Sequence, residues 1–120
     1  MSTAARRGKP GKASGERRDL MLQSRRVAVA LKGQLQGCSP LFISDASTFV
    51  SRRIEAALRE SRPLGAILLL AAAAELRIRV PAALLECCGA AVSGEAHAGL
   101  RCLYWAACAR LMRHRLLRAD

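Results

Sequence analysis

The strongest constraint on the fold is a block of residues 67–74 (ILLLAAAA) that contains only isoleucine, leucine and alanine. It lies within the apolar stretch 64–76, which is too short to span a membrane because a span needs roughly 20 residues. Alanine and leucine are strong helix formers, and a helix that is apolar on every side has to be buried on several of them. The chain must therefore surround this central helix with its own helices or with those of a partner.

The overall charge indicates the class of ligand. The 120 residues include 20 Lys and Arg against 9 Asp and Glu, for a formal net charge of +11. An excess of this size favours a polyanion, nucleic acid first and an anionic membrane second. The length predicts one domain with a tail, and neither a signal peptide nor a transmembrane segment is expected. The odd number of cysteines, in apolar helical contexts, favours reduced thiols in the cytosol or nucleus.

Residues 1–18 are expected to form a disordered basic tail. Four glycines and prolines, Gly8, Pro10, Gly11 and Gly15, interrupt any helix there, and Glu16 is the single acid. Such a segment either solubilises the protein or binds phosphates, and its density of positive charge favours phosphate binding.

The remaining pattern predicts an all-α protein. Helices are expected over residues 19–35, 46–61, 82–92 and 95–118, in addition to the central run. The connection 37–45 contains a β-like triplet at 41–43, and residues 76–80 (LRIRV) alternate like a short strand. Pro63 should end or kink a helix at the preceding residue. Residues 19–92 are read as one domain, and residues 93–120 as a basic helical extension of it.

Four short stretches occur in order along the first 92 residues. The first comprises Leu20, Leu22, Arg26, Val27, Leu31 and Lys32. The second comprises Ala46, Phe49, Val50, Ser51, Ile54 and Glu55. The third comprises Ile67, Leu68, Leu70 and Ala71. The fourth comprises Arg79, Val80, Pro81 and Leu84. Preceded by a basic Gly/Lys tail, this series resembles a core histone of the two-A class, over roughly residues 2–92.

The resemblance implies a histone fold, with short, long and short helices joined by brief strand-like loops. It also implies a chromatin protein of the nucleus and chromosome that pairs with a histone two-B-type partner, and with other core histones in a nucleosome. Three features depart from the family: Pro63 falls inside the median helix, Glu55 alone represents the acidic patch, and residues 93–120 lack the docking segment. Such departures are similar to those of short, divergent histone variants.

A DNA-binding role would use cations that neutralise phosphates without reading bases. The candidate DNA-binding residues are Arg6, Arg7, Lys9, Lys12, Arg17, Arg18, Arg25, Arg26, Lys32, Arg77 and Arg79. The candidate partner interface is apolar and comprises Phe49, Ile54, Leu58, Ile67, Leu68, Leu70 and Leu84.

No metal site, cofactor or enzymatic activity is expected. Cys87 and Cys88 are adjacent, whereas most zinc sites separate paired cysteines by two or more residues. Cys102, Cys108 and His114 follow one another at intervals of six, so they point to different sides of a helix. No nucleophile–base pair, paired carboxylates or phosphate-binding glycine loop is present.

Two alternatives to a nucleosomal histone variant remain open at this point. One is a histone-fold subunit of a transcription or repair complex, in which pairing matters and DNA wrapping does not. The other is a small basic helical bundle that lies on anionic membranes, through a helix over residues 100–117 that carries Trp105 and several arginines.

Overall fold

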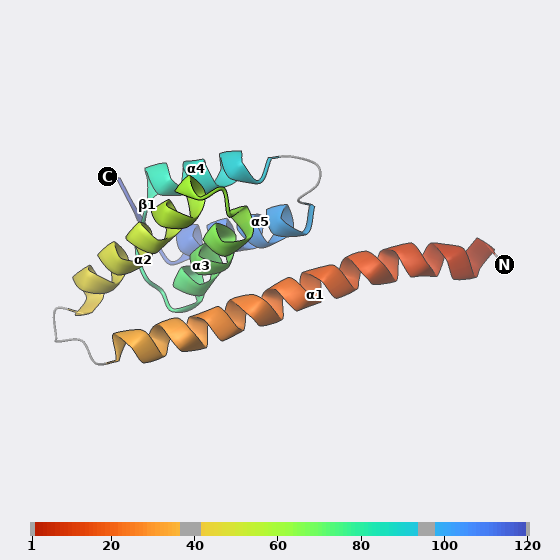
Figure 1. Ribbon diagram of the computed structural model, residues 1–120, viewed down its shortest axis with the longest axis horizontal. Helices are drawn as coiled ribbons and strands as arrows, with labels where there is room; N and C mark the ends of the chain where they lie inside the picture. The colour runs from red at the N-terminus through yellow and green to blue at the C-terminus, as the bar shows by residue number, and fades with distance from the viewer. Residues whose placement is uncertain (1, 37–41, 94–97, 120) are drawn as a thin grey trace.

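The computed structural model describes the backbone of residues 2–36, 42–93 and 98–119, and the side chains of residues 15, 18–36, 46–93 and 98–119. The described parts are mostly helical, which confirms the all-α prediction. The helices are α1 (Ser2–Leu35), α2 (Phe42–Arg59), α3 (Pro63–Glu75), α4 (Ala82–Ala91) and α5 (Ala98–Arg113). Two short strands, β1 (Val80–Pro81) and β2 (Leu117–Arg118), complete the order (Figure 1).

Helix α3 is the centre of the core, as its composition predicts. Ile67 and Leu70 are fully buried, and so are the alanines at 66, 72 and 73. Helices α1, α2, α4 and α5 all contact α3, and Figure 1 shows them grouped around it. The central helix is therefore covered by the chain's own helices.

Pro63 divides the region in which the histone resemblance implied one long median helix. Helix α2 ends at Arg59, and α3 begins with Pro63 in its first turn, where the missing N–H costs nothing. Between them Ser61 has a φ of 57°, and the chain reverses so that α2 packs beside α3. The implied continuous helix is wrong for this chain, because proline inside a helix removes a hydrogen bond and clashes with the preceding turn.

Three helices end in the same way, with a left-handed residue that is not glycine. Ser61, Arg77 and Arg115 have φ values of 57°, 60° and 54°. At the end of α3, the N–H of Ile78 donates to the Ala73 carbonyl at 2.8 Å and that of Arg77 to the Ala74 carbonyl at 3.2 Å. Equivalent pairs of bonds close α2 and α5. This is the Schellman motif, in which glycine is the usual left-handed residue.

The two strands join the loop after α3 to the end of the chain. They pair in parallel, with Val80 opposite Leu117, and the Val80 N–H donates to the Leu116 carbonyl at 2.9 Å. Strand structure therefore occurs at the end of the predicted segment 76–80, and its partner lies in the predicted C-terminal extension. That extension is also part of the core, because α5 packs against α3 and α1 and its Leu111 is fully buried.

The N-terminal boundaries also differ from the predictions. Residues 2–18 continue α1 and do not form the expected disordered tail, and Figure 1 shows this half of α1 extending away from the other helices. Its alanines, arginines and lysines are good helix formers, and α1 continues backwards from residue 19 through Gly8, Pro10 and Gly11, whose own propensities oppose a helix. Of the β-like triplet 41–43, Phe42 and Ile43 begin α2. Residues 37–41 of the predicted connection and the first residues of the helix expected over 95–118, residues 95–97, lie outside the described residues.

Candidate nucleic-acid interface

A groove between α1, α3 and α5 gathers positive charge from distant parts of the sequence. It has a volume of about 310 Å³. Arg25 of α1 lines it together with Arg110 and Arg113 of α5, and all three side chains are exposed. Its apolar lining is mostly alanine and comprises Ala71, Ala74, Ala106, Ala107 and Ala109, together with Met21 and Leu103. Glu75, at the end of α3, is the acid among the lining residues.

The positive charge continues beyond the groove to the left-handed residue after α3. Desolvation lowers the pKa of His114, and the nearby charges of Arg77, Arg113 and Arg110 lower it further. Arg77 is exposed and lies only two residues beyond Glu75. We call Arg25, Arg77, Arg110 and Arg113 the cationic cluster; the imidazole of His114 lies beside it.

The guanidinium groups of the cluster are not used in ion pairs within the described residues. Arg62 pairs with Glu60, its Nε lying 3.4 Å from Oε1, but the four arginines of the cluster form no such pair there. Cations that converge without internal partners repel one another. They are stabilised when a multivalent anion such as a run of phosphates neutralises them.

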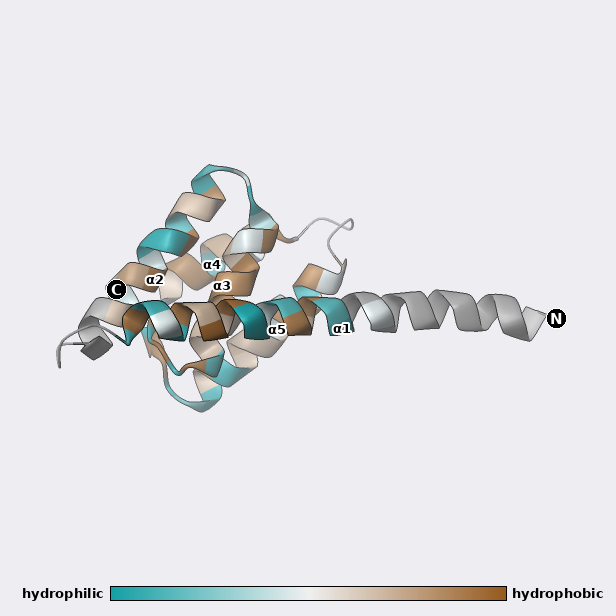
Figure 2. Cartoon of the chain, turned by 60° about the horizontal axis from the view of Figure 1, so that its bottom comes forward, coloured by the Kyte–Doolittle hydropathy of each residue, from teal (hydrophilic) through white to brown (hydrophobic). Residues whose placement is uncertain are grey.

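The solvent-facing side of α1 adds further cations next to the cluster. Leu20, Ala28 and Leu31 point into the core, so the opposite side of the helix faces water. Arg18, Arg25, Arg26 and Lys32 are exposed, with Asp19 the acid among them. Figure 2 shows α1 crossing α5, with hydrophilic and hydrophobic residues alternating along it. Arg25 belongs to both surfaces and makes them continuous.

The structure brings together only some of the predicted DNA-binding residues. Arg25 and Arg77 lie in the cationic cluster, whereas Arg26 and Lys32 are exposed on α1 outside the groove lining. Arg79 is exposed, and its backbone carbonyl accepts a hydrogen bond from Ser47 Oγ at 2.7 Å. The side chains of Arg6, Arg7, Lys9, Lys12 and Arg17 lie outside the described residues.

Sequence reasoning missed the α5 side of the cluster. The sequence indicated that the last helix becomes basic at its end, which is the one signal for Arg110 and Arg113. It gave no indication that this end packs beside Arg25 and Arg77. That neighbourhood results from the contacts of α5 with α1 and α3.

The predicted partner interface is used inside the chain. Ile54, Ile67 and Leu70 are fully buried, while Leu68 and Leu84 are exposed by less than a tenth. Phe49 and Leu58 are partly buried and pack against the same core. The reversal at Ser61 folds α2 onto α3, so most of these side chains are used inside the chain, and Phe49 also lines an open hollow.

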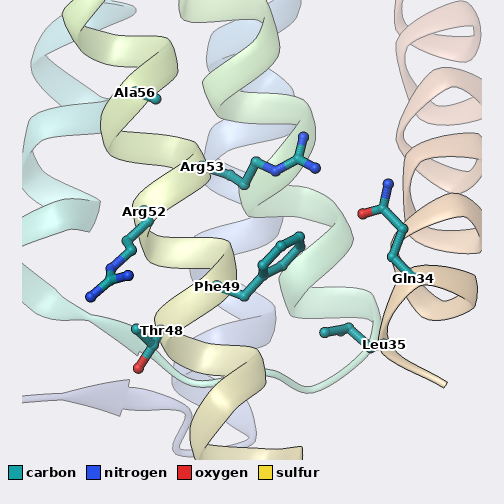
Figure 3. A pocket seen from close by; sticks show the side chains of 7 residues that line it. All are labelled: Gln34, Leu35, Thr48, Phe49, Arg52, Arg53 and Ala56. Carbon is teal, nitrogen blue, oxygen red and sulfur yellow. The ribbon is translucent and has the colours of Figure 1, made fainter. Parts of the chain in front are cut away.

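A second hollow, of about 540 Å³, lies between α2 and the end of α1. Its lining comprises Gln34, Leu35, Thr48, Phe49, Arg52, Arg53 and Ala56. The Arg53 guanidinium carbon lies 5.0 Å from the centre of the Phe49 ring. In Figure 3 Phe49 and Arg53 extend toward Gln34 on α1, while Arg52 points the other way. The hollow therefore has an apolar wall with one cation held over it.

Cys88 is buried within α4 and is held in its protonated form. Burial raises the pKa of Cys88 to about 12, with smaller contributions from Cys87 and Cys108, so its thiol stays protonated at neutral pH. Among the described residues, no group of three or more His, Cys, Asp and Glu side chains is placed to hold a metal ion. Tyr104 donates its hydroxyl hydrogen to the Leu85 carbonyl at 3.1 Å beside these thiols.

None of the described helices combines the length and the apolar character needed to cross a bilayer. Comparison with protein-family models, with curated proteins and with solved structures finds no match to this chain.

Proposed function

We propose that this protein binds DNA without sequence preference and acts as a chromatin protein of the nucleus. The observation that carries the proposal is the convergence of Arg25, Arg110 and Arg113 around one groove, with Arg77 close enough to His114 to act on it together with Arg110 and Arg113. Each phosphate that such a cation neutralises releases a condensed counterion, which favours binding to any DNA sequence.

The cluster and the outer side of α1 supply one continuous contact surface. Arg18, Arg26 and Lys32 extend the charge along the helix from the shared Arg25. Arginines attached to helices in this way position a protein on the phosphate backbone, and they carry no direct sequence information. The excess of 20 basic over 9 acidic residues supports the same role.

The histone resemblance supports the chromatin setting, and pairing with a histone two-B-type partner forms part of the proposal. Pairing through the apolar residues of α2 and α3 requires the two helices to separate, since Ile54, Ile67 and Leu70 are fully buried in the chain itself. Co-refolding with histone two-B followed by gel filtration tests this part. A one-to-one complex supports it, whereas a stable monomer removes the pairing and leaves DNA binding to be judged separately.

The DNA-binding test compares two double variants that lose the same charge at different places. Arg110→Gln with Arg113→Gln removes two cations of the cluster, and Arg52→Gln with Arg59→Gln removes two exposed cations of α2. Fluorescence anisotropy with two unrelated DNA duplexes over a series of salt concentrations measures affinity and salt dependence.

We expect the cluster variant to lower the slope of log affinity against log salt by about 1.8, since each lost phosphate contact removes about 0.9. The α2 variant should change the slope by less than half of that. Equal effects of the two variants would show that only the net charge matters, and would refute an interface at the cluster. Affinities that differ strongly between the two duplexes would refute binding without sequence preference.

A further inference from the structure

Helix α5 carries an apolar surface that borders the cationic groove and shares Ala109 with its lining. Its inner side packs into the core through Leu100, Leu103, Ala107 and Leu111. Its outer side is also apolar, and comprises Cys102, Trp105, Ala109 and Met112, all exposed. These residues recur at intervals of three and four and so lie on one side of the helix. We call them the α5 stripe.

The large side chains of the stripe are unusually exposed for their type. Trp105 is 65% exposed and Met112 is 61% exposed. They are seven positions apart, which corresponds to two turns along the same side of α5. Large apolar side chains grouped on one exposed surface are typical of a binding site, whereas single ones are ordinary.

Trp105 is held in place by the core beneath it. Its ring meets the Tyr104 ring edge to face, with centroids 5.1 Å apart and planes at 68°. Tyr104 is itself buried and hydrogen-bonded to the Leu85 carbonyl. A fixed, exposed tryptophan loses little conformational freedom on binding, and such residues often supply a large share of interface energy.

The charges that α5 itself carries all have one sign. Arg110 and Arg113 project from the same helix, and residues 98–119 contain no acidic residue. Exposed tryptophan, methionine and arginine without lysine or acid form the composition that is enriched in protein interfaces. A second copy would bring the same arginines together on a chain of charge +11, and DNA would leave the apolar stripe uncovered.

We infer that the α5 stripe is a docking surface for an amphipathic helix of another protein, one whose apolar side is edged by carboxylates. Apolar side chains of that helix cover Trp105 and Met112, and its carboxylates pair with Arg110 and Arg113. Recognition of a helix through residues at three- and four-residue spacing is a recurring mode of protein binding.

Trp105 is the single tryptophan of the chain, so its emission reports directly on the stripe of the full-length protein. The probe is a synthetic helical peptide of about three heptads, with leucine at the a and d positions and glutamate at the flanking positions. The matched control peptide has lysine in place of every glutamate. We expect the glutamate peptide to shift the Trp105 emission to shorter wavelength in a saturable way, and the lysine peptide to leave it unchanged.

A labelled form of the same peptide measures affinity for the variants. Trp105→Ala and Met112→Ala should each weaken binding about tenfold or more, as loss of an interface hot spot does. Val29→Ala is the control, since Val29 is 72% exposed on α1 and should leave the affinity unchanged. Circular dichroism verifies that each variant keeps the helical fold, which is expected because these side chains lie outside the core.

Three results would overturn the inference. The first is an equal emission shift with the lysine peptide. The second is a shift with vesicles of phosphatidylserine and phosphatidylcholine but none with the glutamate peptide, which would make the stripe a lipid-binding surface. The third is a shift that follows protein concentration alone, together with a dimer in sedimentation, which would assign the stripe to a second copy.

Discussion

Glycine substitutions at Ser61 and Arg77, the left-handed residues after α2 and α3, test two things. They measure how much each left-handed conformation destabilises the fold, and whether the Arg77 side chain contacts DNA. Ser61 and Arg77 have φ values of 57° and 60°, a conformation that costs a non-glycine residue roughly 1–2 kcal/mol. Glycine removes this cost, but its greater conformational freedom in the unfolded chain lowers the free energy of unfolding by about 0.4–1 kcal/mol. Ser61→Gly should therefore raise the free energy of unfolding by about 0.5–1 kcal/mol.

Arg77→Gly should give a smaller gain in stability and a loss of DNA affinity. A cation at a helix C-terminus stabilises the helix dipole by about 0.3–1 kcal/mol, and this contribution disappears with Arg77. The net change in the free energy of unfolding should then be about 0–0.5 kcal/mol. Because Arg77 also belongs to the cationic cluster, the salt dependence of DNA affinity should fall by about 0.9 in slope.

Urea denaturation measures the free energy of unfolding, and fluorescence anisotropy with a DNA duplex measures how DNA affinity depends on salt. Ser61→Gly is the matched control. Ser61 lies at the α2–α3 reversal and is not part of the cluster, so its variant should keep the wild-type salt slope. A destabilised Ser61→Gly protein would contradict the left-handed cap. A wild-type slope for Arg77→Gly would refute a phosphate contact at Arg77.

Gly89→Ala should destabilise the fold by about 1–3 kcal/mol, because an added Cβ would lie 2.6 Å from the Tyr104 hydroxyl oxygen. Combining it with Tyr104→Phe should recover part of the loss in urea denaturation, and no recovery would place the strain elsewhere. Leu70→Ala should cost about 2–5 kcal/mol because Leu70 is fully buried, whereas Leu64→Ala, at a position 43% exposed, should cost far less; equal losses would contradict the central place of α3. The pKa of Cys88 is raised from 9.0 to about 12, so its protonated thiol contributes stability that is complete below pH 9 and is lost as the pH rises toward 12. Wild type should therefore lose more stability than Cys88→Ala between about pH 8 and pH 11, and parallel losses would refute a buried neutral thiol.

Much of the secondary structure follows from local features of the sequence. Residues 67–74 have the composition of a buried helix, and the structure buries them in α3. The ends of the elements were less predictable. Aromatic and β-branched residues favour strands, which predicts β-like structure at Phe42 and Ile43, yet these residues begin α2. Helical neighbours with tertiary contacts overrode that preference.

Pro63 shows the limit of a local signal. It predicts an interruption of the helix, but a kink and a full reversal are both compatible with it. The reversal depends on Ser61 adopting a left-handed conformation, for which serine carries no signal. Because of this reversal, Ile54, Ile67 and Leu70, which the sequence predicts as partner-interface residues, are buried within the chain itself.

The sequence by itself determined the helical composition, the burial of the central run and the excess of positive charge. Each of these depends on residue type and on spacing over a few positions, which are local properties. Only the tertiary structure decided that α5 joins the core, that Arg25 and Arg77 lie near Arg110 and Arg113, and that Trp105 and Met112 point outward. Those results depend on which sides of separate helices pack together. The packing is set by the chain reversals and by the total apolar area buried, and neither can be deduced from the spacing within one helix.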